Sequence, residues 1–142
     1  MLSWQFVEER LVAAANYWIA TVGSAGAPHV RPVDGVWVDG ALCFGGSPQT
    51  QWVRNLQRDP RLSAHVPDDD EVIILEGRGE LVTDDAHPLA DPSVRATRSK
   101  YPQYYAEEQG PSFRPFWSLR PNTVFAWTLS GFPQNVTRWH FQ

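Results

Sequence analysis

Short runs of β-forming residues, each closed by a turn signal, recur along this sequence and limit the folds it can adopt more than any other feature. Tight-turn signals such as Gly23–Gly26 and Asp39-Gly40 separate these runs. Gly77 and Gly79 interrupt the longest run and predict a bulge or bend, as small barrels need at their corners. The predicted strands are Tyr17–Val22, His29–Val38, Ala41–Phe44, Arg61–Val66, Val72–Val82, Phe116–Leu119, Thr123–Leu129 and Val136–Phe141. This pattern predicts a mainly β protein, a small antiparallel barrel.

Helical periodicity appears in three places between these strands. Apolar residues at three-to-four spacing predict a helix over Trp4–Asn16, with Ser3 as its N-cap. A second helix is predicted over Thr50–Arg58, and a third over Ala86–Tyr101, where two prolines interrupt the pattern. The Pro- and Tyr-rich stretch Tyr101–Phe116 is predicted to be a long loop. The helices are therefore expected at the periphery of the barrel.

Composition narrows the class of protein further. The 142 residues suit one domain, 1–142, and 42% hydrophobic residues suffice for a packed core. The net charge of -4 gives no general attraction for nucleic acid or an acidic membrane. A single cysteine, Cys43, excludes an internal disulfide and is predicted to be a small buried residue. No membrane span or signal peptide is expected, so the predicted location is the cytoplasm.

Common catalytic and nucleotide-binding motifs are absent. The sequence has no phosphate-binding G-x-x-x-x-G-K-[ST], no G-x-G-x-x-G and no H-E-x-x-H. Its histidines, which lack metal-ligand spacing, are His29, His65, His87 and His140. No metal site is therefore predicted, and no residue is identified as a catalytic acid, base or nucleophile.

Several stretches share their order and spacing with a known family. They are 17–22, 28–33, 35–44, 50–61, 76–82, Pro121, 125–127 and 137–139. Together they resemble the pyridoxamine 5′-phosphate oxidase-like family of flavin-binding split β-barrels, a group that includes deazaflavin-dependent reductases. The resemblance covers nearly the whole chain. It implies a split β-barrel of six or more antiparallel strands, of Greek-key type, with peripheral helices.

The resemblance also implies a function and a cofactor. The expected activity is that of a flavin- or deazaflavin-dependent oxidoreductase that transfers hydride to or from a small-molecule substrate. The expected cofactor is FMN, with the deazaflavin coenzyme F-420 as the alternative, in a groove at the interface of a homodimer. The competing hypothesis is a non-catalytic protein that carries or senses a flavin, haem or another planar ligand.

Nine residues fall at family positions that contact the cofactor. Phosphate binding is implied for Arg31 and for 50–52 at the start of the second helix, where free N–H groups also favour an anion. Val33 would line the flavin face, and Gly45 and Gly46 would let the backbone approach the ring system. Trp127 and Arg138 would reach the ring from the partner subunit. The full set is Arg31, Val33, Gly45, Gly46, Thr50, Gln51, Trp52, Trp127 and Arg138.

Some positions depart from the family pattern. Gln51 and Trp52 stand where the family often has a basic pair, and Val36 stands where its oxidases carry a lysine. This shortage of positive charge argues against a true pyridoxamine phosphate oxidase, and Arg54, one helical turn further on, is the predicted replacement.

The proposed contact residues also have structural alternatives. The alternative for Arg31 is an ion pair with Asp34 or Asp39, and for Arg138 a cross-strand ion pair. For Trp52 the alternatives are packing in the core or at a dimer interface, or stacking on the cofactor. For Trp127 they are packing in the sheet core or contact with the cofactor. Trp18 and Trp37 are predicted to be core residues.

Overall fold

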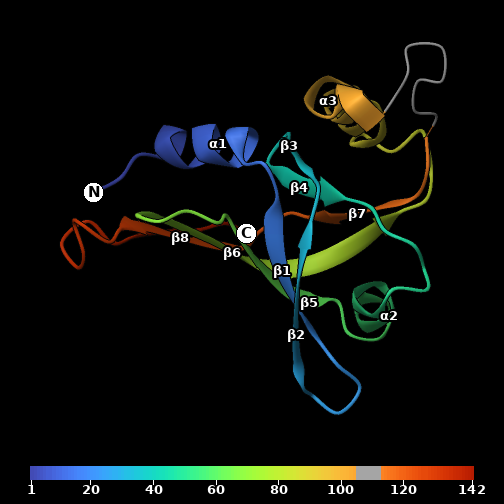
Figure 1. Cartoon of the computed structure of the whole chain (residues 1–142), viewed down its shortest axis with the longest axis horizontal. Coiled ribbons are helices and arrows are strands. Elements are labelled where there is room, and N and C mark those ends of the chain that lie inside the picture. The colour runs from blue at the N-terminus through green and yellow to red at the C-terminus, as the bar shows by residue number, and fades with distance from the viewer. Residues whose placement is uncertain (105–112) are drawn as a thin grey trace.

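The computed structural model describes residues 1–104 and 113–142, and within them strands dominate (Figure 1). The strands are β1 (Tyr17–Val22), β2 (Pro28–Val33), β3 (Val36–Val38), β4 (Ala41–Phe44), β5 (Arg61–His65), β6 (Glu71–Val82), β7 (Phe116–Leu119), β8 (Thr123–Thr128) and β9 (Thr137–His140). The helices are α1 (Trp4–Ala13), α2 (Gln51–Arg58), α3 (Ala90–Lys100) and a 3-10 turn, Pro102–Tyr104. No described helix has the length and apolarity that a membrane crossing requires.

The described strands form one curled antiparallel sheet in the order β2-β1-β5-β6-β7-β4-β3, with β8 paired to β6 and β9 to β8. The 12-residue β6 belongs to both halves of the sheet, because Glu71–Glu76 pair with β8 whereas Gly79–Val82 pair with β7. Figure 1 shows β6 running through the molecule between these halves. Gly77 and Gly79 lie where β6 changes its partner from β8 to β7, at the bend that the sequence predicts. The strand pairings confirm the prediction of a mainly β, antiparallel fold.

Two layers of side chains fill the space between sheet and helices. Tyr17 and Ile19 on β1 are fully buried against Val7 and Leu11 of α1, and the Tyr17 hydroxyl donates to the Leu11 carbonyl. A second cluster, which includes Cys43, lies between β3, β4 and α3. The predicted burial of Cys43 is confirmed, and burial raises the pKa of its thiol to about 12.

The predicted strand His29–Val38 is wrong as a single element. The structure ends β2 at Val33 and starts β3 at Val36. Gly35 sits in the break because a Cβ there would come within 2.9 Å of the Cys43 carbonyl oxygen and 3.3 Å of the Tyr17 ring. The turn dipeptide Asp34-Gly35 and this close approach together divide the strand.

Two helices are shorter than predicted. Helix α1 ends at Ala13 because Ala14 is already extended, which frees the chain to enter β1. Helix α3 starts at Ala90, four residues later than expected, since the Asp84 carboxylate and the His87 ring accept backbone N–H groups in turns that precede it. The predicted loop Tyr101–Phe116 is described only at its ends, and its middle lies outside the described residues.

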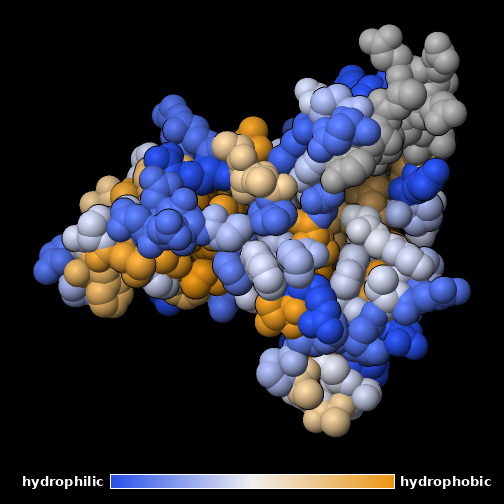
Figure 2. Space-filling view, in the orientation of Figure 1, coloured by the Kyte–Doolittle hydropathy of each residue, from blue (hydrophilic) through white to orange (hydrophobic). Residues whose placement is uncertain are grey.

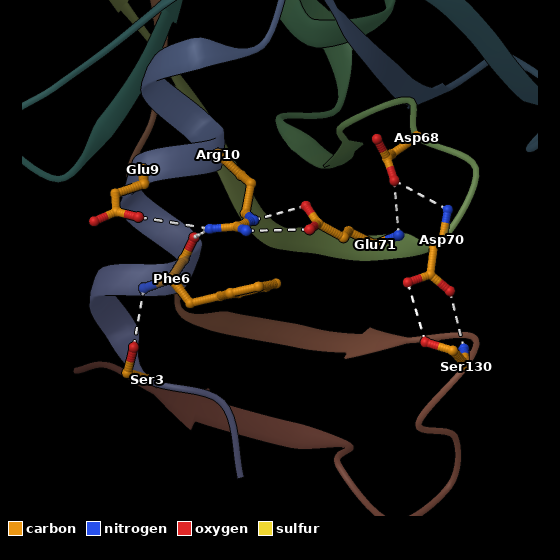
Figure 3. Close-up of polar contacts among 8 residues, drawn as sticks. All are labelled: Ser3, Phe6, Glu9, Arg10, Asp68, Asp70, Glu71 and Ser130. Carbon is orange, nitrogen blue, oxygen red and sulfur yellow. Dashed lines mark hydrogen bonds and ion pairs between the residues drawn. The ribbon is translucent and has the colours of Figure 1, made fainter.

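A polar junction ties α1 to the turn between β5 and β6 and on to the loop between β8 and β9 (Figure 3). Arg10 donates to both carboxylate oxygens of Glu71, at 2.6 and 3.1 Å, and its guanidinium lies 3.6 Å from the centre of the Phe6 ring. Asp70 accepts from the Ser130 backbone N–H at 2.9 Å and from its hydroxyl at 3.2 Å. The junction therefore fixes the end of the sheet where β6 begins and β8 ends. We call the paired strands β6 and β8 the β6–β8 arm.

Candidate cofactor-binding site

Helix α2 begins without a side-chain cap. Thr50 occupies the N-cap position, but its hydroxyl donates to the Ser47 carbonyl at 2.7 Å and accepts no helix N–H. A helix start leaves its first N–H groups without partners inside the helix, and these groups favour an anion. The first backbone N–H groups of α2 therefore have no side-chain acceptor at the N-cap, and they remain the anion donors that the sequence predicts.

A polar face of α2 anchors the helix on β1. Asn55 is fully buried and donates from Nδ2 to the Thr21 hydroxyl at 3.0 Å. Gln51 donates to Asn55 Oδ1 at 2.7 Å, and Arg58 donates to the Val22 carbonyl at 2.6 Å. These bonds place α2 over the sheet face that carries the Thr21 side chain.

The predicted phosphate ligand Arg31 lies on this same face. Residues directly opposed on neighbouring strands point to the same side, and Arg31 opposes Ile19 while His29 opposes Thr21. The Arg31 side chain is exposed, and within the described part of the chain its guanidinium donates only to the carbonyl of the preceding residue, at 2.8 Å. Burial, and then the charge of Arg31, lower the pKa of His29, whose Nε2 is buried and has no partner among the described residues.

Three arginines around α2 carry charge that no described carboxylate neutralises. Arg31, Arg54 and Arg58 make no ion pair with any residue of 1–104 or 113–142. Among the described arginines only Arg10 and Arg61 pair with a carboxylate, and Arg61 does so with Asp59 at 2.7 Å. Arg58 lies in the last turn of α2, so of the three only Arg31 and Arg54 can add charge to the N–H groups at the helix start, and such charge suits a phosphate or carboxylate.

The structure brings together only part of the predicted site. Val33 is buried opposite Tyr17 in the core. Trp52 is 7% exposed, and its ring centre lies 5.4 Å from that of Phe44. A Cβ on Gly46 would overlap the Trp52 ring, whereas one on Gly45 would meet open space. In the single chain Trp52 is therefore a core residue that requires Gly46, and cofactor contact by these residues stays a prediction.

The two C-terminal site residues lie on the opposite face of the sheet from α2. By register, Trp18 opposes His65, His65 opposes Ile74 and Ile74 opposes Phe125, all pointing away from α2. Phe125 opposes Arg138 on β9, and Trp127 follows two residues later on the same face. Trp127 and Arg138 therefore cannot meet Arg31 within one chain. The core prediction for Trp18 is corrected too, because its ring is only half-buried and stacks on His65 at 6.5 Å.

Two hollows of the described surface lie away from α2. The larger has a volume of about 620 Å³ and a smaller one, of about 250 Å³, adjoins it beside α1. The larger is lined by Ser63, His65, Val66, Pro67, Asp68, Asp69, Glu71, Val72, Ile73 and Ile74. No predicted site residue lines either of these two hollows. Among the described residues no cluster of histidine, cysteine, aspartate and glutamate could hold a metal ion.

The model of the pyridoxamine 5′-phosphate oxidase family matches residues 5–128. This chain belongs to that family. In fold it is similar to the conserved hypothetical protein Rv2991 from Mycobacterium tuberculosis, with 21% identity, 90% of this chain and 86% of that one covered, and a TM-score of 0.76. A heme binding protein from Mycobacterium smegmatis shares 22% identity over 99% of this chain and 59% of its own, with a TM-score of 0.70.

A third structure strengthens the assignment of the fold. A Clostridium acetobutylicum protein related to general stress protein 26, of the pyridoxinephosphate oxidase family, shares 14% identity over 96% of this chain and 93% of its own, with a TM-score of 0.68. No curated protein matches this chain. The family and the split-barrel fold expected from the sequence are confirmed, and identities this low carry no activity across.

The buried amide of Asn55 offers a direct test of how α2 is held. Replacing Asn55 by Ala should lower the free energy of unfolding by about 2 kcal/mol, because the buried Thr21 hydroxyl loses its partner. Urea unfolding followed by tryptophan fluorescence measures the loss. Gln57→Ala, at an exposed position of the same helix, is the control and should change stability by less than about 0.5 kcal/mol. Equal stability of the two variants would contradict the anchoring role.

Proposed function

We propose that this protein is a flavin- or deazaflavin-dependent oxidoreductase that holds the phosphate of its cofactor beside α2. The observation that carries the proposal is that Arg54 on α2 and Arg31 on the sheet face that α2 covers carry charges with no described acid as partner. The uncapped start of α2 adds N–H donors, and the orphaned Nε2 of His29 lies on the same face. These groups fit a cofactor phosphate, and Arg54 supplies charge that Gln51 and Trp52 do not.

The ring system of such a cofactor needs a second wall, which we assign to a homodimer. The sheet face turned away from α2 carries half-buried apolar side chains, and Figure 2 shows hydrophobic residues gathered over the arm that β6 and β8 form. The half-buried apolar side chains on this sheet face include Trp18, Ala20, Val72, Ile74, Phe125 and Trp127. A second copy packed on this face would cover it.

When bound, the cofactor would supply the hydride chemistry. The residues of this chain would bind the phosphate through Arg31 and Arg54, orient the cofactor and exclude water from it. The described part of the α2 site holds no carboxylate, and its one imidazole, that of His29, has a lowered pKa. This arrangement suits a transfer that depends on the cofactor more than on a protein acid or base.

A second candidate is a non-catalytic protein that binds a planar ligand such as a flavin or haem. Two observations favour it: the site lacks a charged acid–base pair, and a structural neighbour is described as a heme binding protein. A carrier and an enzyme would share the groove and differ in turnover.

The visible spectrum of the freshly purified protein, with mass spectrometry of any released ligand, tests both candidates. Titration with FMN, the deazaflavin and haemin follows, read by fluorescence and thermal unfolding. The oxidoreductase requires that FMN or the deazaflavin bind and that a nicotinamide or another hydride donor reduce it in the complex. Binding without reduction would favour the carrier, and no response to either flavin at saturating concentration would overturn the oxidoreductase proposal.

A further inference from the structure

The chain contains one lysine, and its amine lies where three elements meet. Lys100 is the last residue of α3, and its side chain is half-buried. Its Nζ donates to the Tyr17 hydroxyl on β1 at 2.9 Å and to the carbonyl of Gly35, between β2 and β3, at 2.8 Å. The Tyr101 hydroxyl donates to the same carbonyl at 3.0 Å. These bonds tie the end of α3 to the sheet, and we call them the lysine junction.

The amine has neutral partners in the lysine junction. Within residues 1–104 and 113–142 no carboxylate lies at ion-pair distance from Lys100, and Asp34 acts on it only from further away. An ammonium group that leaves water without a counter-ion in contact is costly, and such a group tends to lose its proton instead. The surroundings of Lys100 therefore favour the free amine more than an exposed position would.

A free amine satisfies the lysine junction as well as an ammonium group does. The Tyr17 hydroxyl gives its own proton to the Leu11 carbonyl, so towards Lys100 it can only accept. The Gly35 carbonyl is also purely an acceptor. These two acceptors need two N–H groups, which is the number that a free amine carries. The nitrogen lone pair is then left for a carbon electrophile.

Burial has the largest influence on the protonation of this amine, and the pKa of Lys100 is lowered to about 8. The titratable groups that face the amine oppose this shift. They are Asp34 through its charge, and Tyr17 and Tyr101 through their rings, whose centres lie 4.7 and 5.4 Å from Nζ. An ordinary lysine, with a pKa of about 10.4, is almost fully protonated at neutral pH, whereas Lys100 keeps an appreciable share of free amine.

We propose that Lys100 is a site of acylation by activated acyl groups, and that its acylation loosens α3. The lone pair attacks the acyl carbon of a thioester or an acyl phosphate, the bond from that carbon to sulfur or oxygen breaks, and the thiolate or phosphate leaves. One proton of the nitrogen passes to solvent. The product is an amide, which persists in water, whereas an imine or a carbamate stays in equilibrium with the free amine. The proposal does not depend on the cofactor of the proposed function.

The consequence for α3 follows from the hydrogen bonds. An acylated nitrogen keeps a single N–H, so either Tyr17 or Gly35 loses its donor. Helix α3 covers the cluster that contains Cys43, whose side chain is 2% exposed and whose thiol contacts the hydroxyl of Ser93 on α3 (Figure 1). Because Cys43 is the single cysteine of the chain, its reaction with a thiol reagent reports how often α3 opens.

Separate incubations with acetyl phosphate and with the thioester S-acetyl-N-acetylcysteamine test the acylation. The matched control combines Lys100→Arg with Arg95→Lys, which moves the only lysine to an exposed position of the same helix at unchanged charge. Peptide mass spectrometry separates the lysine from the N-terminal amine. Lys100 should react at pH 8 roughly fivefold faster or more than the lysine at position 95, because more of it is free amine.

The pH profile of the same reaction is measured on the unaltered chain and does not depend on the folding of the control. The acetylation rate of Lys100 should reach half its maximum near the lowered pKa of about 8. A faster reaction with only one of the two reagents would identify the class of donor. Equal or slower reaction than at position 95 with both reagents, or a midpoint of about 10.4, would overturn the acylation site.

The reaction of Cys43 with a chromogenic disulfide tests the loosening of α3. Acetylation of Lys100 should speed this reaction roughly threefold or more, because a lost hydrogen bond raises the open fraction of the helix. Acetylation of the control chain at position 95 should leave the rate of Cys43 as it was. A Cys43 rate that acetylated Lys100 does not raise would refute the loosening. Neither measurement uses a flavin, so failure of the proposed function would leave both results unchanged.

Discussion

Replacing Trp52 by Ala should lower the free energy of unfolding of the cofactor-free protein by about 3–5 kcal/mol. The indole is 7% exposed, packs on Phe44 and lies so close to Gly46 that a Cβ there would overlap it. Its removal leaves a cavity that neighbouring side chains fill only in part. Urea unfolding followed by circular dichroism, without added ligand, measures the effect.

Trp18→Ala is the matched control for this prediction. Trp18 is also a tryptophan beside the sheet, but its ring is half-buried on the face turned away from α2 and stacks on His65. Its loss should cost the monomer clearly less than the loss of Trp52. If Trp52→Ala kept its stability and lost only cofactor affinity, the residue would be a stacking platform and its assignment to the core would be wrong.

Elements set by local pattern were predictable from the sequence. The predicted limits of β1, Tyr17–Val22, and of β4, Ala41–Phe44, agree with the structure to the residue, because turn residues bound each run. The break between β2 and β3 was missed although Asp34-Gly35 is a turn dipeptide, and only the structure shows that Gly35 also makes room for Tyr17 and a carbonyl of β4. The early end of α1 likewise follows from the need to start β1.

The candidate site was predictable only where local spacing decides it. The periodicity around α2 indicates a polar face with Gln51, Arg54, Asn55 and Arg58 on one side. Which strand that face covers depends on the bond from Asn55 to Thr21, 34 residues away, and no local signal carries it. The alternatives for Trp52 were open for the same reason, because the contact with Gly46 exists only in the folded chain.

Sheet register explains why two predicted residues stand apart from the rest. The alternation along β8 shows that Phe125 and Trp127 share a face, but only the full register from β1 to β9 shows that this face is opposite α2. Trp127 and Arg138 therefore lie on the other side of the sheet from Arg31, and their contact with a cofactor, which the resemblance implies, stays a prediction.

Replacing Arg31 by Ala should raise the dissociation constant for FMN or the deazaflavin by roughly 10- to 100-fold, which corresponds to the loss of one charge-assisted contact of about 1.5–3 kcal/mol. The stability of the cofactor-free protein should hardly change, because the guanidinium is exposed and pairs with no described acid. Fluorescence titration at two salt concentrations measures the affinity, and its salt dependence should weaken in the variant as one cation is removed.

Arg61→Ala is the control for Arg31→Ala. Arg61 is exposed on neighbouring β5, but its guanidinium is already held by Asp59, at 2.7 Å, and the pair adds no net charge to the α2 site. Its removal should leave the cofactor affinity within about twofold, a change of some 0.4 kcal/mol. Were the two variants to bind equally well, the phosphate would lie elsewhere. If both instead lost affinity alike, the attraction would come from the general field of the arginines, and Arg31 would have no direct contact with the phosphate.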